Sequence, residues 1–246
     1  MPGAYAVVSC HVDHPLDDRS WRLLAELQER RPSGFRIAAL MRPPDLAAGE
    51  DEERWVERAR EAAARGPVGH HTHFGGPSQA RPRAGDDPVA RVRAEAAWLG
   101  GRGFSPRFFC GGGWYMDRGL AETVAELGYV DCTATEVRPR YLEKDAPRFE
   151  LDHPAWLTFD GGRLLALPTT HSIGRAAGAM LDPEPLRELV HVYFHDADLR
   201  SPARRRALLG ALAILRRRRN PSDLEQAADE FAETAPELEL SAASRP

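Results

Sequence analysis

Histidine and aspartate recur where apolar, strand-like runs of this sequence end. His11 and Asp13 are two residues apart at the end of the first such run, and His71 and His73 repeat that spacing at the end of another. Residues two apart in a strand point to the same side, so each pair presents its side chains together. A third apolar run, late in the chain, ends in His195.

Imidazoles and carboxylates gathered in this way are typical of a site for a divalent metal ion. Neutral imidazole nitrogens and one carboxylate, with a position left for water, make up a catalytic zinc site. Such an ion lowers the pKa of its water enough to give hydroxide near neutral pH. One histidine at a strand end is more often a hydrogen-bonded core residue, but three runs that end in this way favour metal binding. His14, His70 and His153 lack this support and are interpreted as structural or surface residues.

The elements that must position these residues alternate between strand-like and helix-like segments. Hydrophobic periodicity predicts strands over 4–12, 35–41, 68–74, 107–111, 129–133 and 189–195, and helices over 17–31, 51–65, 87–99, 117–127 and 202–219. A loop over 135–154 and a hairpin over 157–167 interrupt this alternation. The pattern favours a parallel sheet covered by helices, and the number of strands favours a barrel over an open sheet. Ligands bind at the carboxyl ends of strands in such folds, where these histidines fall.

Length and composition indicate one globular α/β domain. The chain has 246 residues, of which 42% are hydrophobic and 28% charged, so global disorder is excluded. We expect the domain over 1–220 and an acidic tail over 221–246, helical to about residue 234 and then loose. The net charge of −4 argues against nucleic acid as a partner. No run approaches the roughly 18 apolar residues that a membrane span requires, so no membrane partner is expected.

The cellular setting is inferred from the amino terminus and the cysteines. No basic region precedes a long apolar run, so we expect no secretory signal. Cys10, Cys110 and Cys132 show no CxxC spacing and cannot all pair, and we interpret them as small buried residues. A reducing, cytoplasmic location is therefore expected, and a homo-oligomer stays open.

The order of these motifs resembles the polysaccharide deacetylases, carbohydrate esterase family 4. The shared features are His-x-Asp after the first strand, a Gly-x-His-Thr strand end, Phe-x-x-Gly-Gly-x-x-x-x-Asp, and a final apolar strand that ends in histidine. They span residues 7–198. No single motif is specific, and their order carries the inference. The resemblance implies a distorted (β/α)7, TIM-like barrel and metal-dependent removal of an acetyl group from nitrogen or oxygen of a sugar.

The resemblance also implies a metal-ligand set, with one departure. Asp13 matches the family's metal-binding aspartate, and His71 in Gly69-His70-His71-Thr72 matches its first metal-binding histidine. The family's second histidine usually comes four residues later, where this chain has Gly75. His73 is the expected replacement, because it shares a face with His71. One divalent ion, most simply zinc, is the implied cofactor.

The family's proton-transfer residues are matched only in part. His195, in the final apolar strand, matches the family's catalytic acid and would protonate the leaving nitrogen. His11 stands where the family has an acidic base, so the base is open between His11, Asp131 and Asp196. His11 is alternatively a third imidazole ligand. Cys110 replaces the arginine of the family's third motif.

Substrate contacts are expected beside the glycine-rich segment. Gly112 and Gly113 would allow close backbone approach, and Trp114 and Tyr115 would stack on a sugar ring unless they belong to the core. His171 is expected to line the substrate pocket. The predicted substrate is an acetylated sugar or sugar-containing metabolite. The alternative is a non-catalytic protein of the same fold that binds a glycan or metabolite.

Overall fold

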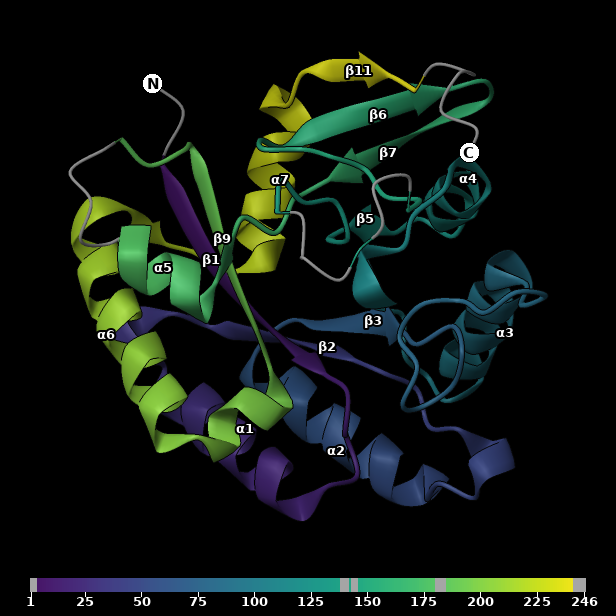
Figure 1. Cartoon of the computed structure of the whole chain (residues 1–246), viewed down its shortest axis with the longest axis horizontal. Helices are drawn as coiled ribbons and strands as arrows, with labels where there is room; N and C mark the ends of the chain where they lie inside the picture. Colours follow the sequence, from purple (N-terminus) through teal and green to yellow (C-terminus); the bar gives the residue numbers. More distant parts are fainter. Residues whose placement is uncertain (1–3, 138–141, 143–145, 180–184, 241–246) are drawn as a thin grey trace.

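The chain is arranged around a central, mainly parallel sheet (Figure 1) in a computed structural model that describes residues 4–137, 142, 146–179 and 185–240. Six parallel strands form its middle, in the spatial order β5-β4-β3-β2-β1-β9. They are β1 (Tyr5–Val12), β2 (Ile37–Met41), β3 (Val68–Thr72), β4 (Phe108–Gly111), β5 (Val130–Asp131) and β9 (Leu189–His195). Each lies inside or within two residues of a strand predicted from the sequence. The mixed α/β class is therefore confirmed.

Helices follow the strands and cover the outside of the sheet (Figure 1). They are α1 (Asp18–Arg30), α2 (Glu52–Arg65), α3 (Pro88–Gly101), α4 (Arg118–Glu126), α5 (Ile173–Ala179) and α6 (Pro202–Arg218). The first four begin after an aspartate whose side chain accepts a backbone N–H of the first turn, as Asp17 does from Ser20 at 2.7 Å. Such a cap satisfies an N–H that the helix itself leaves unpaired. α5 was not predicted from the sequence, and the other five were predicted to within two residues.

The carboxyl-terminal part of the chain returns to both edges of the sheet. The hairpin β6 (Ala155–Phe159) and β7 (Gly162–Ala166) is antiparallel, and its turn contains Gly161 with φ of 91°. After α7 (Leu224–Thr234), β11 (Glu237–Glu239) pairs in parallel with β6. The loose structure predicted beyond residue 234 was therefore wrong for β11. Backbone hydrogen bonds to the exposed edge of β6 order it, and these are not encoded by a local pattern.

The closed barrel expected from the sequence is not confirmed. The ladder of described strands has two ends, at β11 and at the two-residue strand β8 (His171–Ser172), which pairs with β9. The segment that follows β7 nevertheless contacts both sides of the gap. Leu167 donates its N–H to the carbonyl of Asp131 at 2.7 Å, and Thr170 donates to the carbonyl of His191 at 3.0 Å. β5 and β8 are too short to extend these contacts into a continuous ladder.

The two faces of β1 show how the fold divides its core. Ala6, Val8, Cys10 and Val12 point outward and pack with apolar residues of α1, α2 and α6. The inward face begins with Val7, in a second apolar cluster that includes Leu224, Ala227, Ala228 and Phe231 of α7. It then continues with Ser9 and His11. The interior is thus apolar near the amino ends of the strands and polar near their carboxyl ends, where it positions the candidate site.

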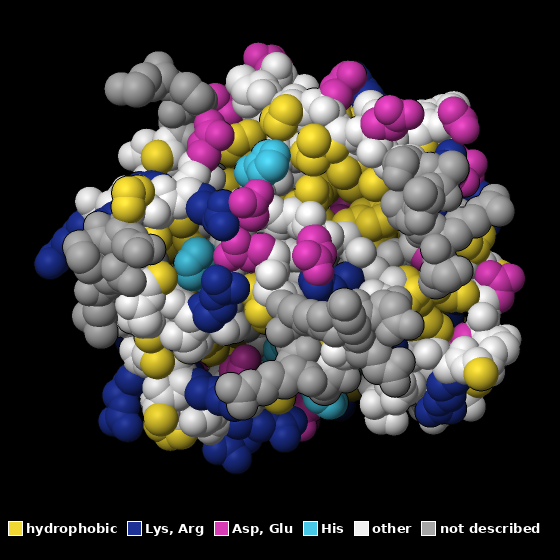
Figure 2. All heavy atoms as spheres, turned by 45° about the horizontal axis from the view of Figure 1, so that its top comes forward, with side chains coloured by type: hydrophobic (Ala, Val, Ile, Leu, Met, Phe, Trp, Pro, Cys, Tyr) yellow, Lys and Arg dark blue, Asp and Glu magenta, His cyan; other side chains and the backbone are white. Residues whose placement is uncertain are grey.

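The surface mixes charged, apolar and neutral side chains, and the cysteines are buried. On the face drawn in Figure 2, acidic and basic side chains are interspersed with apolar and neutral ones. Cys10, Cys110 and Cys132 are free thiols and all three are buried, as predicted. Among the helices of the described residues, none combines the length and apolar character needed to cross a bilayer.

Candidate active site

The carboxyl ends of β1, β3 and β9 open onto a pocket of about 330 Å³. Its lining contains the three predicted metal ligands and two of the three predicted catalytic residues. The lining residues are His11, Asp13, His14, His71, His73, Pro77, Ser78, Ala80, Gly111, Gly113, Trp114 and His195. Four strand-end histidines and a carboxylate are therefore gathered around one cavity, as the spacing in the sequence indicated.

Asp13, His71 and His73 form the centre of this pocket. The Nε2 atoms of His71 and His73 each lie 3.2 Å from Oδ1 of Asp13. One potential ligand atom of each residue lies within 4.8 Å of the other two. Both imidazoles are buried, and the Asp13 side chain is 18% exposed, toward the pocket. The three side chains thus converge on one point that remains accessible from the pocket.

The second nitrogen of each imidazole determines what its Nε2 can do. Nδ1 of His71 lies 2.8 Å from the carbonyl oxygen of Cys110, and Nδ1 of His73 lies 3.0 Å from that of Pro77. A carbonyl oxygen only accepts, so each Nδ1 carries the hydrogen and donates it. In the neutral imidazoles both Nε2 lone pairs therefore face a carboxylate oxygen. Such an arrangement is repulsive unless a proton or a cation lies between them.

The donor set fits a zinc-like ion. Zn–N and Zn–O bonds at tetrahedral angles place two ligand atoms roughly 3.3–3.6 Å apart, close to the 3.2 Å seen from Asp13 to each imidazole. Histidine ligands of metals commonly donate their other N–H to a carbonyl or carboxylate, as both do here. The pocket supplies the open position that a catalytic site keeps.

The electrostatics of the three groups suit a cation as well. Burial alone would raise the pKa of the Asp13 carboxyl, but its contacts with His71 and His73 outweigh burial and hold that pKa below its usual range. Burial lowers the pKa of His71, although the Asp13 carboxylate partly offsets this. A metal requires an ionised carboxylate and a neutral imidazole, so metal binding near pH 7 costs no free energy for deprotonating either residue.

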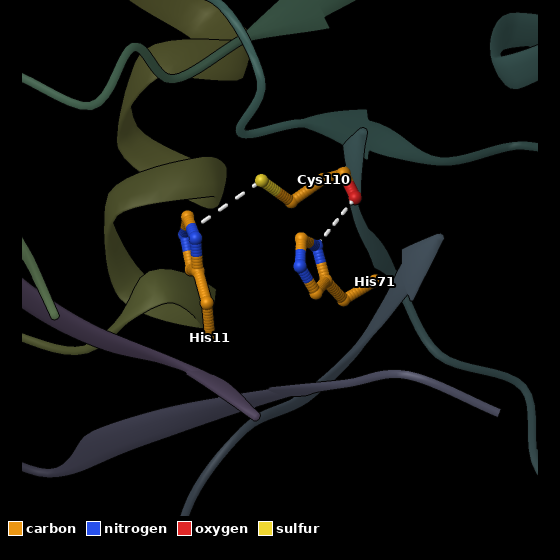
Figure 3. Close-up of side chains that lie close together, drawn as sticks. All are labelled: His11, His71 and Cys110. Carbon is orange, nitrogen blue, oxygen red and sulfur yellow. Dashed lines mark hydrogen bonds between the residues drawn. The ribbon is translucent and has the colours of Figure 1, made fainter. Parts of the chain in front are cut away.

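His11 lies beside this centre and deeper in the interior. Its ring centroid is 5.0 Å from that of His71 and 5.2 Å from that of His195. Figure 3 shows its Nε2 directed at the thiol of Cys110, 3.7 Å away, with the His71 ring alongside. Burial, followed by the charges of His71 and His195, holds the pKa of His11 well below its usual value. The ring is therefore neutral, and it is a weaker base than an ordinary histidine.

His195 occupies the rim of the pocket. It pairs in register with His11 across β9 and β1, and its side chain is 37% exposed. Its backbone N–H donates to Oδ2 of Asp198 at 3.0 Å, and Nδ1 of the ring lies 3.9 Å from the same oxygen. The position beside both solvent and pocket is what a residue that delivers protons to a leaving group needs.

The glycine-rich segment forms one wall of the pocket. Gly113 and Trp114 line it and have positive φ angles of 59° and 56°. Positive φ is unfavourable for a bulky side chain, so surrounding contacts must hold Trp114 there. Its indole N–H lies 3.3 Å from Oγ1 of Thr169. Gly112 lies behind the wall, where a Cβ would come within 2.6 Å of two backbone oxygens, those of Thr72 and Ala80.

Two other residues predicted to contact substrate lie away from the pocket lining. The hydroxyl of Tyr115 donates to Asp117 at 2.6 Å, and its ring packs against Phe74. His171 is buried in β8, with Nδ1 at 2.8 Å from Oγ1 of Thr170. Neither belongs to the described lining of this pocket.

Asp131 is fully buried and also lies outside the described pocket lining. Its two carboxylate oxygens accept the backbone N–H groups of Thr133, at 2.7 Å, and Ala134, at 3.0 Å. Burial raises the pKa of Asp131 to about 6, although these hydrogen bonds oppose it. The geometry gives Asp131 a clear structural task at the end of β5.

The raised pKa of Asp131 predicts a pH dependence of stability. The folded state holds the proton more tightly than the unfolded state, so this stabilisation is present below about pH 4 and is lost as the pH rises through about 6. We expect the wild-type chain to lose roughly 2–3 kcal/mol more than Asp131→Asn between pH 4 and pH 7. Urea unfolding of the metal-free chain at a series of pH values measures this difference.

The readout is the slope of the unfolding free energy against pH. Asparagine accepts from only one of the two N–H groups, so the Asp131→Asn variant is less stable by an amount that does not change with pH. Asp160→Asn is the control, because Asp160 is exposed at the tip of the β6–β7 hairpin. Parallel curves for the wild type and Asp131→Asn would contradict the prediction.

Sequence reasoning missed one titratable residue of the described pocket lining and misplaced another residue. His14, interpreted as structural or surface, lines the pocket. Asp196, considered as a base, lies close to Asp13 and His14 but outside the described pocket lining, and its Oδ2 accepts the His14 backbone N–H at 2.9 Å. Their proximity follows from the pairing of β1 with β9, since Asp196 directly follows β9 and His14 lies two residues beyond β1.

Comparisons with known proteins give a likeness of fold. No protein-family model and no curated protein matches the chain. Among solved structures, it is similar to a 4-alpha-glucanotransferase from Thermococcus litoralis, with a TM-score of 0.57 and 10% identity. The match covers 98% of this chain and 42% of that protein, so this chain spans less than half of its length.

Two further structures are more distant in fold. A putative polysaccharide deacetylase involved in O-antigen biosynthesis, from Bordetella bronchiseptica, has a TM-score of 0.47 and 11% identity over 94% of this chain and 90% of that one. A family 4 carbohydrate esterase from Streptomyces lividans, in complex with acetate, has a TM-score of 0.45 and 12% identity over 96% and 92%. At these identities the relationship concerns the fold alone.

Proposed function

We propose that this protein is a metal-dependent hydrolase that removes an acetyl group from a sugar or a sugar-containing metabolite. One observation carries the proposal. Two imidazoles, each held by a carbonyl in the form that leaves Nε2 free, converge on the Asp13 carboxylate beside an open pocket. The resemblance of the sequence motifs to polysaccharide deacetylases supplies the substrate class.

Asp13, His71 and His73 would hold the divalent ion. When bound, the ion would supply Lewis acidity, which favours ionisation of water and stabilises negative charge on an acyl oxygen. The carbonyls of Cys110 and Pro77 keep the two imidazoles oriented, so little conformational entropy is lost when the ion binds.

The other pocket residues would move protons and hold the substrate. Of the three candidate bases, His11 is the one in the described pocket lining, and it would take the proton from water, although burial makes its ring a weaker base than an ordinary histidine. His195 would donate a proton to the leaving nitrogen from the rim. Trp114 is in the pocket lining, and its indole would pack against a bound sugar ring.

Release of acetate tests this function directly. We expect the purified chain to release acetate from at least one member of a panel of N-acetylated monosaccharides, nucleotide sugars, N-acetylated oligosaccharides and O-acetylated sugars. A chelator should lower the rate at least 100-fold, and added zinc should restore it, because the ion contributes several kcal/mol to catalysis. A chain that binds an acetylated sugar without turnover, with and without zinc, would favour the non-catalytic alternative.

A further inference from the structure

His14 and Asp196 form a second group of metal-binding side chains at the pocket, outside the proposed metal ligands. The register that pairs His11 with His195 brings the residues after β1 and β9 together. Oδ2 of Asp196 accepts the backbone N–H of His14 at 2.9 Å, and Nδ1 of His14 lies 3.4 Å from Oδ1. The imidazole is 54% exposed, so this group lies nearer to solvent than His71 and His73.

The Asp196 carboxylate is buried beside His14. Its side chain is 1% exposed. Among the ion pairs of the described residues it takes part in one, with His14, which is charged only when protonated. The N–H of Ala197 donates to Oδ1 at 2.8 Å. A buried carboxylate whose one ion-pair partner among the described residues is this imidazole is further stabilised by a metal cation nearby.

Asp13 belongs to both groups of potential ligands. Asp13, His14 and Asp196 each offer one potential ligand atom, and these three atoms lie within 4.8 Å of one another. The same holds for Asp13, His71 and His73. Oδ1 of Asp13 lies 3.2 Å from Nε2 of both imidazoles of the first group. A carboxylate has two oxygens, and in two-metal sites it can bridge ions about 3.5–4 Å apart.

We propose that the pocket holds a second divalent cation, bound by Asp13, His14 and Asp196, with Asp13 as the bridging carboxylate. The inference rests on the proposed function, since the first ion shares Asp13. One imidazole and two carboxylates suit manganese or zinc. The exposure of His14 makes this the more weakly bound and more readily exchanged ion of the two.

The test counts metal ions rather than turnover. Metal-free chain is dialysed against manganese or zinc, and bound metal is measured by elemental analysis. We expect two ions per chain in the wild type, and one in both Asp196→Asn and His14→Ala. The second variant guards against misfolding, because the His14 side chain is largely exposed. Electron paramagnetic resonance of the manganese-loaded wild type should show two coupled ions, and that of Asp196→Asn an isolated one.

Asp198→Asn is the matched control. Asp198 lies in the same turn as Asp196 but belongs to neither ligand group, so this variant should keep two ions. One ion in the wild type that Asp196→Asn and His14→Ala both retain would overturn the second site and leave the proposed function standing. No bound ion in the wild type would overturn both.

Discussion

Asp13→Ala, His71→Ala and His73→Ala are each expected to remove the ion bound at the first site and to lower kcat/KM for an acetylated sugar about 10³-fold. Each variant deletes one of three side chains whose donor atoms converge. A metal contributes several kcal/mol to the stabilisation of developing charge, which corresponds to a rate loss of this size. Elemental analysis of the purified variants, combined with acetate release, measures both effects.

A histidine of the same strand provides the control. His70 lies on β3 next to His71, but its side chain points to the opposite face and lies 2.8 Å from the carboxylate of Glu95. His70→Gln should keep full metal occupancy. Undiminished metal in all three ligand variants would refute the site. Full occupancy in His73→Ala alone would refute the role of His73 and make His11 the next candidate ligand.

Much of the fold follows from local sequence signals. The caps Asp17, Asp51 and Asp87 lie three residues before the N–H groups that they bind, so the start of each helix is encoded nearby. β11 and the segment around 167–172 depend instead on hydrogen bonds to strands far away in the chain. Such pairing needs the tertiary register, which a single sequence does not contain.

The candidate site also combines features that local sequence encodes with features that depend on the tertiary fold. The spacing of His71 and His73 is enough to place both on one face, because alternation along a strand is a local property. The nearness of His14 to Asp196 comes from the pairing of β1 with β9, across 182 residues. The interior position of Asp131 also depends on distant packing. Local spacing therefore indicated the first group of proposed ligands, and tertiary structure was needed for the second.

His195→Ala is expected to lower kcat for an N-acetylated sugar about 10²-fold or more while bound metal stays unchanged. An amine is a poor leaving group unless its nitrogen is protonated, and His195 at the pocket rim is placed to supply that proton. Metal-assisted ionisation of water has its own dependence on pH, so a pH profile does not identify the acid.

The leaving group separates proton delivery from a merely structural role. The leaving group of a nitrophenyl acetate is a stable nitrophenolate that departs without being protonated. His195→Ala should therefore slow hydrolysis of this ester far less than hydrolysis of the amide. Asp198→Asn is a milder companion variant, since it alters the carboxylate that accepts the His195 backbone N–H without removing the imidazole. Equal losses on amide and ester would show that His195 supports the pocket rather than the proton transfer. Loss of metal from His195→Ala would make it a ligand.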